Sequence, residues 1–181
     1  MKVVVVFLVV VVMMLAAATS FAAKANDANL NVSIGNFMLS NGEVADMVGP
    51  GLGITLNKEI PMSGLLGSLK NVKLYGNLSY VRFSNSYQGV SIKETLIPIT
   101  VRAIKDFDLE NKSSLRPYAG LGVGIVLMSL DIEGTSGSKT DACLELIGGT
   151  KFGSNAFAEL KYLGGKRNGN TGWGLNVGCS F

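Results

Sequence analysis

The chain has 181 residues, of which 48% are hydrophobic and 16% are charged, and it contains no histidine. The absence of histidine removes the commonest general base and the commonest metal ligand. Of its 16 basic residues, Lys2 and Lys24 lie in an apolar leader, so the rest of the chain nearly balances its 13 acidic residues and lacks the basic excess that binding to nucleic acid requires.

Residues 1–25 have the layout of a secretory signal peptide. Lys2 precedes an uninterrupted apolar run of 13 residues from Val3 to Leu15, and small residues follow this run. Those small residues predict cleavage after Ala22 or after Ala25. A transmembrane anchor is the alternative, but the run is shorter than the roughly 18–20 residues that span a bilayer.

Residues 26–181 are expected to form one domain made of strands and turns. Eight segments alternate apolar side chains with small or polar ones, which is typical of strands with two different faces. Pro98 withholds a ladder donor, so we expect a bulge or a local break in the fourth segment. The segments are 29–37, 51–57, 71–83, 91–104, 116–130, 142–152, 156–163 and 172–181.

Turn-rich segments separate these strands. We expect outer loops at residues 40–50, 84–91, 131–141 and 164–171. The segment 58–71, on the opposite side, is as long as the outer loops, and its sequence GLLGSL is the place where we expect a short helical turn. Loop 131–141 is acidic, but its spacing does not match an EF-hand calcium loop, so we interpret it as a solvated tip.

The residue types on the less apolar face of the strands indicate which face lines the barrel interior and which contacts lipid. This face carries mainly Gly, Ser, Asn and Thr, with scattered charges of both signs, which suits the narrow interior of a barrel of about eight strands. The apolar face lacks charges across the strand centres, as hydrocarbon demands, because Lys or Arg at the bilayer midplane costs about 2–4 kcal/mol. The inward charged residues are predicted to be Lys73, Glu94, Arg102, Glu145, Glu159 and Lys161.

These features predict an all-β fold, an eight-stranded antiparallel up-and-down transmembrane β-barrel. In three features the chain resembles the small bacterial outer-membrane β-barrel family, which includes opacity-type proteins and the membrane domain of the major outer-membrane anchor protein. The three features are the signal peptide, the strand RPYAGLGVGI with Tyr118 and alternating glycines, and the terminal strand that ends at Phe181. The resemblance covers residues 26–181.

The resemblance implies a location in the cell outer membrane, in contact with its lipid. In that family the final aromatic residue and its alternating apolar partners form a signal for the barrel-assembly machinery, which with periplasmic chaperones is the implied partner during biogenesis. The corresponding residues in this chain are Trp173, Leu175, Val177 and Phe181. The family also implies surface loops that act in adhesion or envelope maintenance.

Two glycine-rich motifs and two cysteines suggest other chemistry, which we reject. The glycines of GLGVG occupy alternate positions inside a strand, whereas a phosphate loop leads into a helix. Lys166 is followed by Arg167, so GGKRNGN does not match a Walker loop. Cys143 and Cys179 are expected near opposite rims and on opposite faces, so we predict two free thiols.

The sequence therefore predicts a structural or interaction protein of the outer membrane. We expect no enzyme activity, no catalytic or metal site and no cofactor, because nothing in the sequence singles out a nucleophile with its base. Two alternatives remain open from the sequence. They are a narrow channel for small solutes and a soluble lipocalin-like ligand-binding barrel.

Overall fold

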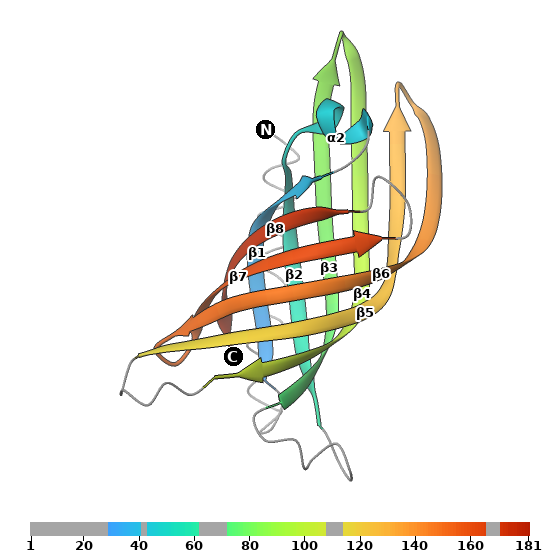
Figure 1. The fold of residues 1–181 in the computed structure, drawn as a ribbon. Coiled ribbons are helices and arrows are strands. Elements are labelled where there is room, and N and C mark those ends of the chain that lie inside the picture. The colour runs from blue at the N-terminus through green and yellow to red at the C-terminus, as the bar shows by residue number, and fades with distance from the viewer. Residues whose placement is uncertain (1–28, 41–42, 62–71, 108–113, 166–170) are drawn as a thin grey trace.

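The computed structural model describes residues 29–40, 43–61, 72–107, 114–165 and 171–181, and it forms a closed antiparallel barrel (Figure 1). Each strand pairs with its neighbours in chain order, and β1 closes the barrel against β8. This is the predicted eight-stranded up-and-down topology. The elements are β1 (Leu30–Leu39), α2 (Glu43–Val48), β2 (Gly51–Ile60), β3 (Val72–Tyr87), β4 (Val90–Asp106), β5 (Leu115–Ile132), β6 (Thr135–Phe152), β7 (Ala156–Gly165) and β8 (Gly172–Ser180).

The two ends of the barrel differ. At one end, which we call the lower rim, β1 begins beside the end of the chain: Leu30 and Phe181 exchange backbone hydrogen bonds of 3.1 and 2.8 Å. At the other end, the upper end, α2 and the tips of the β3–β4 and β5–β6 hairpins lie beyond the rest of the barrel (Figure 1). The upper end therefore carries the longest projecting structure of the described chain.

The period-2 pattern predicts correctly which side chains face outward. In β2, Leu52 is 67% exposed on the outer surface, while Thr55 is 2% exposed in the lumen. The register with β1 and β3 is continuous over this stretch, so outward residues of adjacent strands lie side by side. A shift of one residue would exchange the two faces.

The outer loops expected at 84–91 and 131–141 are much shorter than predicted. Both segments continue the strands as hairpins that turn within two residues, with pairing up to Tyr87↔Val90 and Ile132↔Thr135. The turns place Gly89 and Gly134 at φ 85°, a left-handed conformation that glycine adopts without steric cost. Two-residue turns of this kind hold strands in register far beyond the barrel wall.

Three further expectations concern local structure. The segment 40–50 contains the short helix α2 where only an irregular loop was expected. At Pro98 the β3–β4 pairing is interrupted opposite Ser79 and Tyr80 and resumes with the same offset, so there is a local break without a bulge. The signal peptide, the GLLGSL segment and the loop after β7 lie outside the described residues. Within the described residues, no helix is long and apolar enough to cross a membrane.

Candidate functional site

The lumen is layered along the barrel axis. Its central layer contains the buried charges Arg102, Glu145, Glu159 and Lys161, which we call the ionic layer. Below it lies a small apolar layer of Tyr75, Ile104, Tyr118 and Ile147. Above it lies the upper apolar layer, which contains Phe37, Val48, Val81, Phe83, Ile92, Leu96, Val126, Cys143 and Leu163.

The ionic layer is centred on Arg102, whose side chain from β4 is fully buried. Its Nε and Nη2 donate to the two carboxylate oxygens of Glu145 on β6, at 2.7 and 3.0 Å. This two-pronged geometry is the strongest form of the arginine–carboxylate pair. Gly122 of β5 makes room for the pair, because a Cβ there would lie 2.9 Å from Glu145 Oε2 and 3.1 Å from Arg102 Cγ. This gives one of the alternating glycines of β5 a concrete role.

The third nitrogen of Arg102 contacts two further strands. Nη1 donates to Asn57 Oδ1 on β2 at 2.9 Å and lies 3.4 Å from Glu159 Oε1 on β7. Glu159 also accepts a 3.2 Å hydrogen bond from the hydroxyl of Tyr118 on β5. One guanidinium therefore connects four strands that are far apart in the sequence.

Lys161 is also buried, but its neighbours differ. Its Nζ donates to the hydroxyls of Thr55 at 3.3 Å and Ser79 at 3.2 Å. Neither partner is charged, so the lysine depends on hydroxyl oxygens for its direct hydrogen bonds. The two carboxylates of the layer balance its charge at longer range, which reduces the desolvation penalty of the buried cation.

The ionic layer links the strands of the barrel to one another through the lumen. Two carboxylates face two cations, and the hydrogen bonds reach six strands, from β2 to β7. Removing only one partner of a buried ion pair strongly destabilises the folded protein, because the other charge stays buried without compensation. The carboxylates of Glu145 and Glu159 accept hydrogen bonds from the lumen side chains of Thr100, Arg102 and Tyr118, so the arrangement links the strands to one another.

Two of the six predicted inward charges lie outside this layer. Lys73 lies at the lower rim, where its Nζ is 3.1 Å from Glu59 Oε2 and its side chain is 40% exposed. Glu94 lies between Ile92 and Leu96 on the inner face of β4, within the upper apolar layer, and its Oε2 has no hydrogen-bond partner among the described residues.

Sequence reasoning missed several members of the polar lumen. Asn57, Asn77, Thr100 and Tyr118 all hydrogen-bond within the ionic layer. Each was recognisable only as an inward position, because its partners come from other strands. A second ion pair at the rim joins Lys151 Nζ to Asp106 Oδ1 at 2.7 Å. It could not be predicted from the sequence either, because the two residues meet only through the strand register.

The expectation of a small, hydrophilic lumen is wrong for the upper half. There the inward positions carry large apolar side chains, and the rings of Phe37 and Phe83 meet edge to face with centroids 6.2 Å apart. Val48 of α2 is 1% exposed and packs into this layer from above. The β3–β4 and β5–β6 hairpins project past the other strands, so their inner faces are buried by apolar side chains. The alternation of the sequence does not predict this, because it does not distinguish one level of the barrel from another.

The outer surface carries a continuous belt of exposed apolar side chains, contributed by all eight strands. Exposed patches larger than a few hundred Å² are uncommon on soluble monomers. The exposed large hydrophobic residues are Ile34, Met38, Leu52, Ile60, Leu78, Tyr80, Tyr87, Ile99, Val101, Phe107, Leu115, Leu121, Val123, Ile125, Ile132, Leu144, Leu146, Phe152, Leu160, Trp173, Leu175, Val177 and Phe181.

The terminal strand contributes four members of this belt: Trp173, Leu175, Val177 and Phe181 all point outward. Trp173 packs against the ring of Tyr162 on β7, with centroids 4.7 Å apart. Phe181 lies at the lower rim beside Leu30. Aromatic residues thus lie on the outer surface at more than one level of the barrel, as in the girdles of membrane barrels.

The cysteines are free thiols, as predicted: Cys143 is buried in the lumen and Cys179 is exposed on the outside. Asp131, in the acidic hairpin, accepts a 3.2 Å hydrogen bond from the amide of Gly134 and so stabilises the turn. Among the described residues, no group of three or more His, Cys, Asp or Glu side chains could hold a metal ion.

No protein-family model matches the sequence, and no curated protein matches it. Solved structures do match the fold. Neisserial surface protein A (NspA) superposes with a TM-score of 0.60 at 18% identity, covering 84% of this chain and 95% of NspA. PagL, described as an outer membrane enzyme, gives a TM-score of 0.52 at 13% identity, over 84% of this chain and 98% of PagL.

A third structure is Ail, the attachment invasion locus protein of Yersinia pestis, in complex with the heparin analogue sucrose octasulfate. It gives a TM-score of 0.50 at 16% identity, over 86% of this chain and 99% of Ail. At these identities the likeness is one of fold. The chain has the fold of small outer-membrane β-barrels over nearly their whole length.

Proposed function

We propose that this protein is a structural or interaction barrel of the bacterial outer membrane. The observation that carries the proposal is the apolar belt around a closed barrel that buries a set of charged residues in its lumen, namely Glu94, Arg102, Glu145, Glu159 and Lys161. In lipid every backbone polar group must be paired within the protein, and a closed barrel does this. A soluble ligand-binding barrel would instead expose its polar face and bury its apolar one.

Fractionation and gel mobility test this assignment. We expect the protein in the outer-membrane fraction, extracted only by detergent, with faster migration before boiling than after boiling. The physical reason is that the closed, ion-clamped barrel resists unfolding by detergent at room temperature. Recovery in the soluble fraction without detergent would refute the membrane assignment.

The filled lumen favours the hypothesis of a closed barrel and argues against that of a narrow channel. Hydrogen bonds from Arg102 on β4 to Glu159 on β7 and from Lys161 on β7 to Ser79 on β3 span the lumen, and the upper apolar layer lies above them. An ion crossing here would have to displace both layers. In planar bilayers we expect no steady conductance from the purified protein, and reproducible single-channel steps would contradict this proposal.

Surface recognition, in adhesion or envelope maintenance, is assigned to the upper end. The two long hairpins and α2 project beyond the rest of the barrel there (Figure 1). Ail, which shares the fold, was crystallised in complex with a heparin analogue, which supports a recognition role for a barrel of this fold.

We propose that the protein has no enzymatic activity, although PagL shows that this fold can support catalysis. The sequence contains no histidine to activate a nucleophile. In addition, the lumen carboxylates Glu145 and Glu159 are committed to Arg102.

Biogenesis is proposed to use the leader 1–25 for export, with cleavage after Ala22 or Ala25, leaving residues 26–181 as the barrel. Trp173, Leu175, Val177 and Phe181 are proposed as the signal for the barrel-assembly machinery, with periplasmic chaperones as carriers. We expect Phe181→Ser to reduce the amount of folded barrel in cells. The matched control is Phe152→Ser, at another exposed lower-rim aromatic, and equal loss in both variants would argue against a special role for Phe181.

A further inference from the structure

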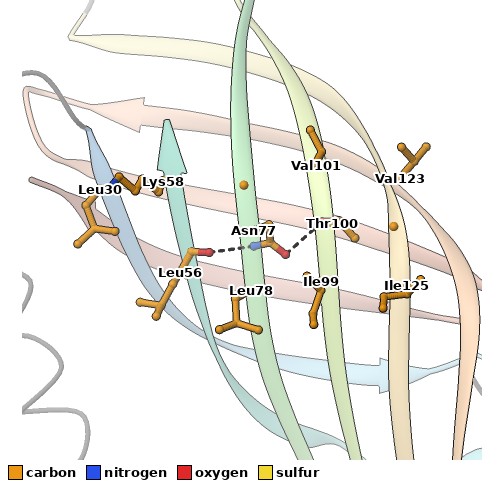
Figure 2. Close-up of a pocket in the computed structure, with 12 residues that line it drawn as sticks. Leu30, Leu56, Lys58, Asn77, Leu78, Ile99, Thr100, Val101, Val123 and Ile125 are labelled. Carbon is orange, nitrogen blue, oxygen red and sulfur yellow. Dashed lines mark hydrogen bonds between the residues drawn. The ribbon is translucent and has the colours of Figure 1, made fainter. Parts of the chain in front are cut away.

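A depression of about 560 Å³ lies on the outside of the barrel wall, near the lower rim (Figure 2). Ligand pockets in proteins commonly measure about 300–1,000 Å³. Its floor is at Gly76 of β3, an outward position with no side chain, where an added Cβ would meet only Ile60 Cδ1, at 3.8 Å. The missing side chain therefore creates the hollow.

The walls of this depression follow from the strand register. Gly76 lies directly between Lys58 of β2 and Val101 of β4. In the next outward row, Leu78 lies beside Leu56 and Ile99. Figure 2 shows these apolar side chains bordering the hollow on the outer face of the wall. Leu30 of β1 and Val123 and Ile125 of β5 extend this aliphatic lining, which therefore spans five neighbouring strands.

Lys58 is the charged residue that borders this depression. It is exposed, points outward, and pairs in register with Leu30, the residue that hydrogen-bonds to Phe181 at the lower rim. Lys58 forms no salt bridge with any described residue. A lysine at this level extends its ammonium towards the membrane interface, where an anionic group can pair with it.

We propose that this depression binds an anionic phospholipid. One acyl chain lies in the aliphatic groove over Gly76, and the headgroup phosphate pairs with Lys58. The inference rests on the proposed membrane location, which places the groove in hydrocarbon and Lys58 near a lipid headgroup. Charge complementarity distinguishes this site from the rest of the belt, because here an unpaired cation and an apolar hollow adjoin.

Native mass spectrometry of the refolded barrel in detergent micelles tests the site. The probes are phosphatidylglycerol, phosphatidylcholine and free glycerol 3-phosphate. We expect the protein to retain phosphatidylglycerol about fivefold more strongly than phosphatidylcholine, the effect of one lysine near an anionic headgroup, and not to retain glycerol 3-phosphate.

Two variants separate the parts of the site. Gly76→Leu fills the groove and should abolish retention of both lipids, while Lys58→Gln should remove the preference for the anionic lipid. The matched controls are Gly148→Leu, at an outward glycine with open space around it, and Lys105→Gln, at another exposed outward lysine. Both controls should behave as the parent protein does.

Equal lipid retention by Gly76→Leu and Gly148→Leu would refute the proposal that the groove over Gly76 holds an acyl chain. Unchanged headgroup preference in Lys58→Gln, or retention of glycerol 3-phosphate as strong as that of the lipid, would overturn the assignment of an anionic phospholipid. Heat-modifiable migration of the same samples keeps this test separate from the membrane proposal. A barrel that is heat-modifiable but shows no groove dependence refutes only the lipid site.

Discussion

The ionic layer and the upper apolar layer occupy one lumen and share the strands β3 to β7, yet they stabilise the barrel by different interactions. Around Arg102 the strands exchange directional, charge-assisted hydrogen bonds. Around Leu96 and Phe83 they exchange only apolar contacts, and α2 closes that layer from above. The comparison teaches that an inward position is not equivalent to a polar position, because each level of the barrel has its own chemistry.

Arg102→Met should have the largest effect. It leaves Glu145 and Glu159 buried without their cation, so we expect the free energy of unfolding to fall by about 3–5 kcal/mol. Guanidinium titration of the refolded protein in micelles, followed by the fluorescence of Trp173, measures it. Arg102→Lys, which keeps the charge and loses the fork, should be intermediate. A loss below about 1 kcal/mol for Arg102→Met would show that the layer is not a clamp.

Leu96→Ala tests the upper apolar layer by the same titration. Leu96 is fully buried, and its truncation leaves a cavity in a tightly packed region, so we expect a loss of about 3 kcal/mol. The control is Leu144→Ala on the outer surface, where lipid or detergent fills the space and the loss should be much smaller. Similar losses at the two positions would mean that the upper layer is loosely packed.

Glu94→Leu should stabilise the protein, by about 1–2 kcal/mol. Glu94 brings a carboxylate oxygen without a partner among the described residues into an apolar layer, and removing such a group relieves its desolvation penalty. The same change at Glu145 should destabilise the protein, because it removes the two-pronged partner of Arg102 and leaves it with Glu159, 3.4 Å from Nη1. If both changes shift the unfolding midpoint in the same direction, the distinction between the two layers fails.

Lys73→Gln should have the smallest effect, a loss below about 1 kcal/mol. The pair with Glu59 is partly exposed at the lower rim, and pairs of this kind contribute little. A titration with urea, which is uncharged, should also show that raising the salt concentration reduces the difference between this variant and the parent protein. A loss as large as that of Arg102→Met would mean that rim pairs and the buried layer contribute alike.

Much of the barrel wall was predictable from the sequence. The alternation in residues 51–57 and 172–181 correctly indicated which side chains point outward, because a strand turns each successive residue to the opposite face. The extended hairpins were not predictable, since Ser, Thr and Gly in 131–141 are equally typical of loops. The helix α2 was also missed, because a segment this short carries too little periodicity to recognise.

The sequence alone determined the period of every strand and hence the two faces of the wall, because side-chain direction depends only on local backbone geometry. Tertiary structure decided which inward residues meet. Arg102, Glu145 and Glu159 are each unremarkable in their own strands, and only the register around the closed barrel brings them within hydrogen-bonding distance. The closed barrel therefore brings the four charges of the ionic layer together. The same closure places Glu94 among apolar neighbours.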